Sequence, residues 1–297
     1  MHVSKFIYAT RQDMCFAKLG NFLDLEIGQN GHGETKKSWV RIHIHPFLFF
    51  LFFSYFVSTM QIPDWYSVIR RRAPKLLTES HNPHFDTHHI RLPFRMLIVG
   101  ASGSGKTQTL LTLIANMRDT FQTVHISTAN RDEPLYNYLV QEFKQMDGFS
   151  IGEGSGSLPP LDELDKKKSN LVVIDDLVTS KNQTMMETYF VRCRKLNCSV
   201  IYISQSFYAV PKMIRNNLSY LIIKQVSSAK NLTMICRECG GLSRDVIQGM
   251  YSDATSTKGG FLMIDCETSD ANKYRRNFDE RYVVSEDESE IAVMPME

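Results

Sequence analysis

The chain has 297 residues, enough for one large domain or for a domain with appendages. Its 43% hydrophobic and 22% charged residues are ordinary for a globular protein, and a formal net charge of +2 is too small to indicate a polyanionic partner by itself. Any contact with nucleic acid must therefore come from local patches. The six cysteines lack the spacing of a small disulfide framework, which favours a reducing compartment.

Residues 1–91 are expected to form an N-terminal extension that contains a Phe/Leu run, Phe47–Val57. About a dozen helical residues span roughly 18 Å, whereas the hydrocarbon core of a bilayer is about 30 Å thick. A single membrane span is therefore not expected, and the run lies too far from Met1 for an ordinary cleaved signal. Three alternatives stay open. The run is buried or covered by a partner, it contacts a membrane surface (the less favoured alternative), or residues 1–59 are not native coding sequence and translation starts at Met60.

Two short segments could in principle bind a metal. The first, "HNPHFDTHH", holds His81, His84, Asp86, His88 and His89. We expect it to form a polar loop before a strand, because no cysteine or second histidine cluster completes a site. The second segment, "CREC" at Cys236–Cys239, is likewise short of further ligands.

From residue 92 onward, apolar runs alternate with helical patterns. Strands are expected at 94–99, 122–128, 171–175, 198–205 and 218–224, with an added edge strand near 259–265. Helices are expected up to about residue 118, from residue 134, and over 184–196. Continuous apolar runs suit strands that are buried on both faces of a mostly parallel sheet flanked by helices. The sequence thus predicts an α/β domain over 92–268, followed by an acidic and mobile tail over 269–297.

The clearest motif is "GASGSGKT", which matches G-x-x-x-x-G-K-[ST] between an expected strand and an expected helix. Its glycines permit backbone conformations in which successive N–H groups point at phosphate oxygens, and the helix N-terminus adds positive charge. Lys106 would reach the β- and γ-phosphates of ATP, and the Thr107 hydroxyl would bind Mg²⁺. The expected nucleotide-binding residues are Gly100, Ala101, Ser102, Gly103, Ser104, Gly105, Lys106 and Thr107.

Two adjacent acids follow the apolar run in "NLVVIDDLV", about 70 residues beyond this loop. A strand that ends in an acid is typical of a Walker B segment. Asp175 would then complete the Mg²⁺ site opposite Thr107. Asp176 would polarise the attacking water as general base. A solvated acid at the end of a strand would explain one aspartate but explains two less well.

Other P-loop classes fit less well. A small GTPase needs an Asn-Lys-x-Asp motif, and the nearest segment, "NKYR" at Asn272, lacks the aspartate. A nucleotide kinase would carry an arginine-bearing lid and use the second acid differently.

The blocks "FRMLIVGASGSGKT", "NLVVIDDLV" and "RCRKLNCSVIYISQSFYAVPKMIRNNLSYLII" are similar to the poxvirus-type DNA-packaging ATPases of large DNA viruses and Polinton-like elements. This family belongs to the FtsK–HerA superfamily of P-loop NTPases, and the similarity covers roughly residues 92–250. The resemblance implies a RecA-like fold in which Gln205 senses the γ-phosphate. It also implies that Arg194, in "RKLN", is an arginine finger that acts on a neighbouring subunit, with Arg192 as the alternative. The superfamily usually has Asp-Glu where this chain has Asp175–Asp176, so another acid such as Glu133 could assist.

The resemblance further implies an ATP-hydrolysing translocase that packages double-stranded viral DNA into a preformed capsid. Its partners would be DNA, capsid or portal-vertex proteins, and further copies of itself in a ring of five or six subunits. Its location would be the host cytoplasm or the virion. Two alternatives stay open: another DNA-dependent ATPase (a helicase or a conjugation-type pump), or a nucleotide-binding assembly factor. Arg70–Arg72 and Lys166–Lys168 are candidate DNA contacts, although such runs are more often solvated surface.

Overall fold

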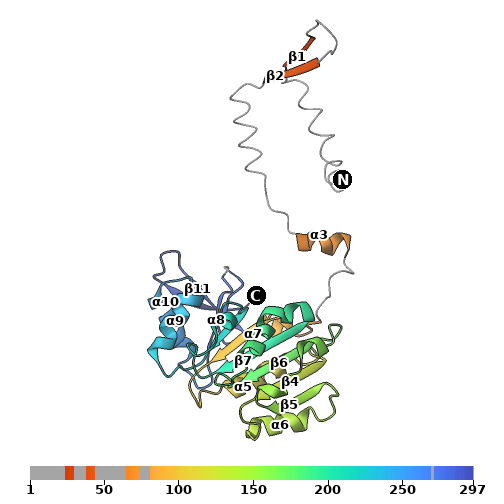
Figure 1. The fold of residues 1–297 in the computed structure, drawn as a ribbon. Coiled ribbons are helices and arrows are strands. Elements are labelled where there is room, and N and C mark those ends of the chain that lie inside the picture. Colours follow the sequence, from red (N-terminus) through yellow and green to blue (C-terminus); the bar gives the residue numbers. More distant parts are fainter. Residues whose placement is uncertain (1–23, 30–37, 44–64, 74–80, 269–270, 297) are drawn as a thin grey trace. The chain divides into compact units, whose positions relative to one another are not determined.

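The computed structural model describes residues 24–29, 38–43, 65–73, 81–268 and 271–296 (Figure 1). The chain divides into two units, residues 1–77 and 78–297. In the first unit, β1 (Asp24–Gln29) pairs antiparallel with β2 (Ser38–His43), and α3 (Trp65–Arg72) ends in three arginines. The Phe/Leu run lies outside the described residues. Within the described part of the chain, no helix is long and apolar enough to cross a bilayer.

The second unit is built on one sheet of ten strands, in the order β12-β11-β10-β9-β8-β3-β7-β6-β4-β5. The strands from β8 to β5 in this order are parallel, and each of the other four is antiparallel to its neighbour. The parallel strands are β3 (Arg95–Val99), β4 (Thr123–Thr128), β5 (Phe149–Glu153), β6 (Asn170–Asp175), β7 (Cys198–Ser204) and β8 (Tyr220–Ile223). The others are β9 (Leu262–Asp265), β10 (Tyr274–Arg276), β11 (Glu280–Val284) and β12 (Ile291–Pro295).

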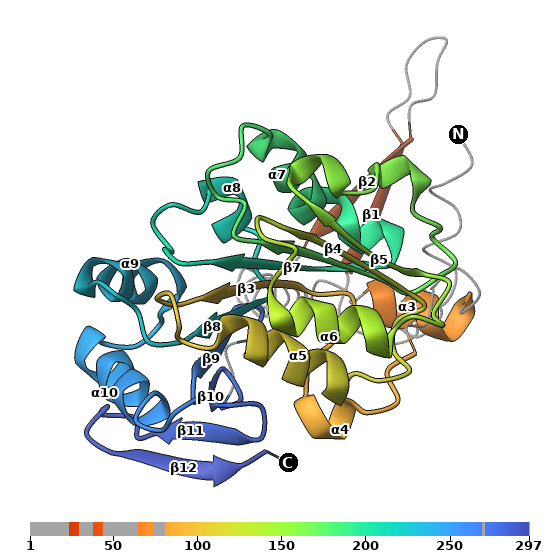
Figure 2. The same cartoon turned by 90° about the horizontal axis from the view of Figure 1, so that it is seen from below.

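Helices cover both faces of the sheet (Figure 2). Apolar side chains of α5 and α6 pack with one face, and those of α7 to α10 pack with the other. The first pair is α5 (Lys106–Asn116) and α6 (Pro134–Glu142), and the short helix α4 (Phe85–His88) lies near α5. The second is α7 (Gln183–Arg192), the short 3₁₀ helix η4 (Cys193–Leu196), α8 (Lys212–Arg215), α9 (Ala229–Cys239) and α10 (Arg244–Ala254). The predicted α/β fold, a mostly parallel sheet flanked by helices, is therefore confirmed.

The parallel strands are continuous apolar runs in the sequence because helices cover both faces of the sheet. Every residue of β6 and of β7 is buried, because both faces of each strand are covered. Since parallel strands point the same way, the carboxyl ends of β3, β6 and β7 meet at one edge of the sheet. The loops that follow these strands are thereby brought together, although they are far apart in the sequence.

The C-terminal segment is not a mobile tail, so the prediction for 269–297 was wrong. Residues from Tyr274 to Pro295 form β10, β11 and β12, and β9 is consequently an interior strand rather than an edge strand. Backbone pairing needs little apolar sequence, which is why the acidic composition concealed these strands. The Tyr282 ring is buried, and its hydroxyl donates to Asp253 Oδ2 at 2.6 Å.

The start of the domain also differs from the expected boundary at residue 92. Ile90 is fully buried, and Arg91 Nη2 lies 2.8 Å from Asp265 Oδ2, so this segment packs as part of the second unit. Within the histidine-rich segment, Phe85–His88 form the short helix α4, and the residues on either side have turn or loop backbone. His88 is buried, and its Nδ1 accepts a hydrogen bond from the Ile90 N–H at 3.0 Å. Among the described residues, no group of three His, Cys, Asp or Glu side chains is arranged to hold a metal.

Candidate nucleotide-binding site

The loop between β3 and α5 has a backbone that glycine makes possible. Gly103 and Gly105 adopt φ values of +74° and +83°, in the left-handed region that disfavours residues with a Cβ. At Gly100 the constraint is close approach, because a Cβ there would lie 2.6 Å from the Cβ of Lys224. The N–H groups of Ser102, Gly103 and Gly105 donate no hydrogen bond to any described residue. They form a set of donors suited to phosphate oxygens.

Lys106 is the first residue of α5 and folds back over this loop. Its ammonium group donates hydrogen bonds to the carbonyl oxygens of Gly100 and Ala101, both at 3.0 Å. Burial lowers the pKa of Lys106, and the carboxylates of Asp176, Asp175 and Glu133 act against that shift. A cation that is held only by neutral carbonyls gains a stronger partner when a phosphate arrives.

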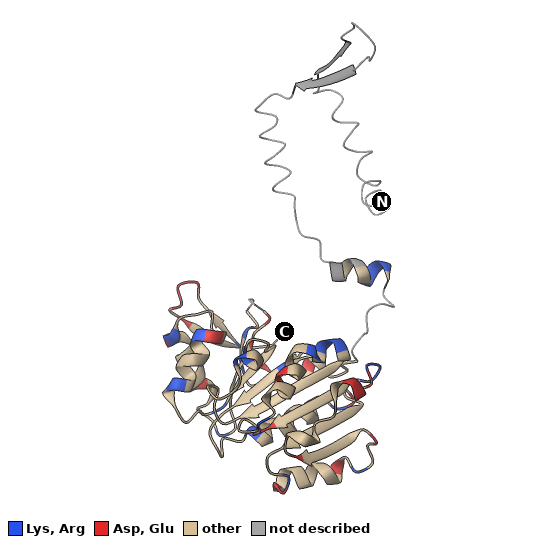
Figure 3. Ribbon diagram, in the orientation of Figure 1, with Lys and Arg blue, Asp and Glu red and all other residues tan. Residues whose placement is uncertain are grey.

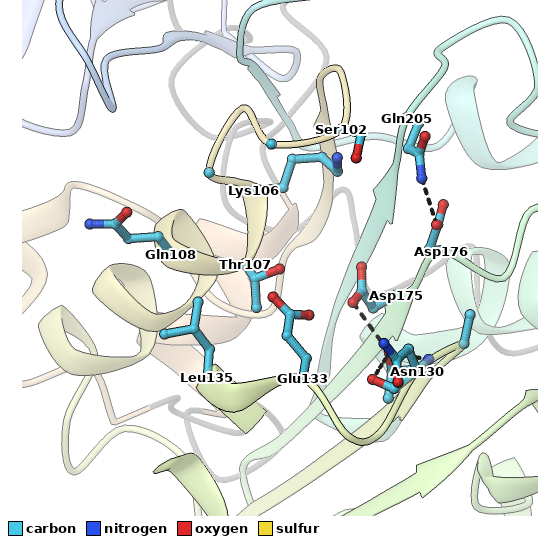
Figure 4. A pocket seen from close by; sticks show the side chains of 14 residues that line it. Ser102, Lys106, Thr107, Gln108, Asn130, Glu133, Leu135, Asp175, Asp176 and Gln205 are labelled. Atoms are coloured by element: carbon cyan, nitrogen blue, oxygen red, sulfur yellow. Dashed lines mark hydrogen bonds between the residues drawn. The ribbon is translucent and has the colours of Figure 1, made fainter. Parts of the chain in front are cut away.

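A pocket of about 410 Å³ opens beside Lys106 at the carboxyl edge of the sheet (Figure 4). It brings together side chains from the phosphate loop and α5, the stretch from the end of β4 to the start of α6, the end of β6 and the residue after β7. The polar side chains that line it are Ser102, Lys106, Thr107, Gln108, Thr128, Asn130, Glu133, Asp175, Asp176 and Gln205.

Asp175 is the last residue of β6 and is buried at the floor of the pocket, with 7% of its surface exposed. The Tyr136 hydroxyl donates to its Oδ2 at 2.6 Å, and the Thr128 hydroxyl donates to the same oxygen at 3.3 Å. These bonds fix the carboxylate and leave Oδ1 for another partner. Burial raises the pKa of Asp175 to about 6, against the opposing effect of the Tyr136 hydrogen bond. A cation bound beside Asp175 would make the negative charge of its carboxylate favourable instead of costly.

Asp176 has a left-handed backbone, with a φ of +54°, which is uncommon for a residue other than glycine. Its amide donates to the Ile203 carbonyl at 3.0 Å, and Gln205 Nε2 donates to its Oδ2 at 2.8 Å. The two side chains expected near the γ-phosphate are therefore hydrogen-bonded to each other. Backbone strain of this kind is often found at functional sites.

Glu133 is the residue before α6, and its carboxylate points into the same pocket, toward Thr107 and Asp175 (Figure 4). Magnesium is typically held by one or two carboxylates together with substrate phosphates and water. The Thr107 hydroxyl, the open oxygen of Asp175 and the nearby Glu133 carboxylate fit that requirement. The oxygen-only donor set suits a hard cation rather than a transition metal.

Arg194 and Arg192 do not lie in this pocket. Arg194 is in η4, before β7, whereas Gln205 follows β7 at the other end. Seven strand residues span roughly 23 Å, which is more than an arginine side chain can cross. The Arg194 side chain is half-exposed, and its Nη1 donates to Glu267 Oε1 at 3.2 Å. Arg192 is exposed and lies 3.5 Å from the exposed Asp162. Neither arginine can therefore reach the phosphate loop of its own chain.

Sequence reasoning missed two residues that support the site. Thr128 ends β4 and Tyr136 lies in α6, and both hold Asp175. Thr128 could have been found, because it ends a strand parallel to the one that carries Asp175. Tyr136 gave no signal, since a tyrosine in a helix is usually a packing residue.

β3, the glycine-rich loop and α5 follow one another in the chain, and a parallel strand of the same sheet ends in an acid. This arrangement defines a P-loop α/β fold. The sequence profile of the family described as Poxvirus A32 protein matches residues 82–144 and 161–273. Because these ranges cover more than half of the chain, the protein belongs to the Poxvirus A32 family.

Individual relatives are more distant. The chain is 25% identical over 200 residues to the DNA packaging protein OPG160 of Vaccinia virus (strain Copenhagen), covering 61% of this chain and 71% of that protein. It is 26% identical to OPG160 of Variola virus, with the same coverage. Among solved structures, the genome packaging NTPase B204 of Sulfolobus turreted icosahedral virus 2 superposes with a TM-score of 0.48 at 11% identity, covering 63% of this chain and 98% of that one.

Proposed function

We propose that this protein is an Mg²⁺-dependent ATPase that packages double-stranded viral DNA. The observation that carries the proposal is one pocket that joins Lys106 and the open loop N–H groups to the buried Asp175. Membership of the Poxvirus A32 family supports it, as does the name of the vaccinia relative, a DNA packaging protein.

Each side chain has a defined task in hydrolysis. The loop N–H groups and Lys106 bind the phosphates of ATP and neutralise charge that develops during transfer of the γ-phosphoryl group. Thr107 and Asp175 would hold Mg²⁺, which would neutralise negative charge on the phosphates. Asp176 accepts a proton from the attacking water as general base. Gln205 orients the Asp176 carboxylate through its 2.8 Å hydrogen bond and is a candidate sensor of the γ-phosphate.

Arg194 would act on the nucleotide of a neighbouring subunit, since its own phosphate loop is out of reach. The end of α7 and η4 are basic, with Arg192, Arg194 and Lys195 close together in the chain (Figure 3). A ring, of five or six subunits, would set this edge of one subunit against the carboxyl edge of the next. The guanidinium would then stabilise charge on the transferring phosphoryl group.

Translocation would grip the DNA backbone rather than read bases, so DNA stimulation should tolerate sequence changes and fall with salt. Arg70–Arg72 in α3 and the exposed Lys166–Lys168 are candidate contacts. Capsid or portal-vertex proteins would be the other partners.

The test is ATP hydrolysis by the full chain, with and without double-stranded DNA. We expect DNA to stimulate hydrolysis. Lys106→Ala should abolish it, whereas Lys181→Ala, which changes an exposed loop lysine outside the pocket, should not. Unchanged activity of Lys106→Ala would refute the site. ATP binding without DNA-stimulated turnover would indicate an assembly factor, and strand unwinding would indicate a helicase.

A further inference from the structure

Lys224 is a buried lysine that has no task in the mechanism above. It is the residue after β8, and 1% of its surface is exposed. Lysine is almost never fully buried unless it is paired. Among the described residues, no carboxylate forms an ion pair with this ammonium, and burial lowers the pKa of Lys224 to about 8. The side chain therefore remains mostly protonated at neutral pH, in a place where a positive charge is costly.

The end of β8 lies against the phosphate loop. The Ala101 amide donates to the Gln225 carbonyl at 2.7 Å, which joins the two backbones. The Cβ of Lys224 lies 2.6 Å from the position that a Cβ on Gly100 would take. Its ammonium lies 4.0 Å from the corresponding position on Gly105. The lysine side chain therefore runs beside the loop from its first glycine to its last.

One hydroxyl connects the Lys224 ammonium to the backbone of the loop. The ammonium donates to Thr109 Oγ1 at 3.0 Å, and the Thr109 hydroxyl donates to the Gly105 carbonyl at 3.1 Å. The Thr109 amide donates to the same carbonyl at 2.9 Å. A hydroxyl that accepts a hydrogen bond from a cation is polarised and becomes a stronger donor. The charge of Lys224 therefore strengthens the bond that holds the Gly105 carbonyl toward α5.

The loop before β9 holds the ammonium from another direction. Lys224 Nζ donates to the Gly259 carbonyl, and it lies 5.4 Å from the centroid of the Phe261 ring. A carbonyl and an aromatic ring are both attractive to a cation, but neither carries a net charge. These contacts fix the position of the ammonium and leave its positive charge uncancelled.

The Gly105 carbonyl belongs to the same peptide unit as the N–H of Lys106. In a trans peptide these two groups point in opposite directions. Holding the carbonyl toward α5 therefore aims the Lys106 N–H out of the helix N-terminus, where phosphate oxygens are expected to bind. Gly105 has a φ of +83°, and glycine exchanges between conformations more readily than other residues. Fixing this peptide in advance lowers the cost of ordering it when a phosphate binds.

We propose that Lys224 is a positioning residue of the nucleotide site, which acts through Thr109 to hold the Gly105–Lys106 peptide ready for a phosphate. This inference rests on the function proposed above. Lys106 contacts the phosphates directly, whereas Lys224 orients a donor and adds positive potential from beside the loop. A carboxylate paired with Lys224 would cancel that potential and repel the phosphates. The neutral partners of this buried ammonium fit the role.

Calorimetric titration of the full chain with Mg²⁺ and inorganic triphosphate tests the inference, because triphosphate reports on the phosphate site alone. Lys224→Met, which has a neutral side chain of similar length, should weaken binding at least about tenfold. Thr109→Val keeps the shape of the side chain but removes the hydroxyl, and should weaken binding at least about fivefold. Thr109→Ser keeps the hydroxyl and should stay within about twofold of the wild type. A role in packing alone predicts the opposite order for valine and serine.

The matched control is Thr112→Val, in the same helix. The Thr112 hydroxyl also donates to the carbonyl four residues before, that of Gln108, at 3.0 Å, but it accepts nothing from a lysine in the described structure. Its triphosphate affinity should stay within about twofold of the wild type. In the double variant of Lys224→Met and Thr109→Val, the loss should be smaller than the product of the two single losses, because both changes break one connection.

Triphosphate affinity of Lys224→Met equal to that of the wild type would overturn the inference. Weaker binding by Thr109→Ser than by Thr109→Val, or losses that multiply in the double variant, would also overturn it. If Lys224→Met does not fold, the serine, valine and control variants decide. Wild-type protein that binds neither triphosphate nor ATP would refute the proposed ATPase function itself. Triphosphate binding by the wild type that Lys224→Met leaves unchanged would refute the role of Lys224 alone.

Discussion

Replacing Asp175 with asparagine should stabilise the metal-free protein and abolish ATP hydrolysis. Burial raises the pKa of Asp175 from 3.8 to about 6, so its charge is a cost in the folded state at neutral pH. This shift corresponds to about 3 kcal/mol, at 1.36 kcal/mol per pKa unit. Asparagine offers the Tyr136 and Thr128 hydroxyls a weaker acceptor, which reduces the expected gain to about 2 kcal/mol. For a domain of the size of residues 78–297, this gain raises Tm by roughly 4–8 °C.

The assay is thermal unfolding in chelator at several pH values, alongside hydrolysis. Because the pKa of Asp175 is higher in the folded than in the unfolded protein, the wild type keeps its full stability below the unfolded pKa of 3.8. It loses stability as pH rises through about 6. The advantage of Asp175→Asn should therefore be complete at pH 8 and small at pH 4.5. Adding Mg²⁺ and ATP should reduce the difference in Tm between Asp175→Asn and the wild type, because only the wild type has the carboxylate that would bind the metal. Asp147→Asn, at an exposed turn, should leave Tm within about 2 °C. A lower Tm for Asp175→Asn at pH 8, or a pH-independent gain, would refute the reasoning.

Three further predictions concern the loop, the base and the arginine. Gly100→Ala should destabilise the protein by about 1–3 kcal/mol in denaturant unfolding, because its Cβ would lie 2.6 Å from that of Lys224; wild-type stability would contradict the close approach. Asp176→Asn should bind ATP normally but hydrolyse it at least about 100-fold more slowly, and retained turnover would shift the role to Glu133. Arg194→Ala should be inactive alone but regain activity in mixed rings that contain a Lys106→Ala subunit; no recovery would make Arg194 a surface residue.

Most of the phosphate site could be predicted from short, continuous patterns in the sequence. The loop from Gly100 to Thr107 is one continuous segment, and the parallel strands read as apolar runs because they are buried on both faces. The acid pair could be placed beside the loop because parallel strands end at a common edge of the sheet.

Strands and contacts that depend on residues far apart in the sequence could not be predicted in this way. β5 (Phe149–Glu153) was not among the expected strands, and its pairing with β4 is what makes it a strand. Every residue of β12 has an exposed side chain, yet the strand pairs along its whole length with β11. Lys224 reads as the polar end of an apolar strand. Its surroundings are set by Gly259 and Phe261, more than 30 residues later, which no local pattern reveals.

Arg194 forms an ion pair with Glu267 of its own chain. The same carboxylate oxygen also accepts from Arg95, the first residue of the strand that leads into the phosphate loop, at 2.9 Å. If Arg194 turns to a neighbour's nucleotide, Glu267 keeps Arg95 and the Ser219 hydroxyl, so no carboxylate is left unpaired. The pair that Arg194 gives up is partly exposed, and such pairs contribute only about 0–1 kcal/mol. Arg194 can therefore leave Glu267 at little energetic cost, as its proposed action on a neighbouring subunit requires.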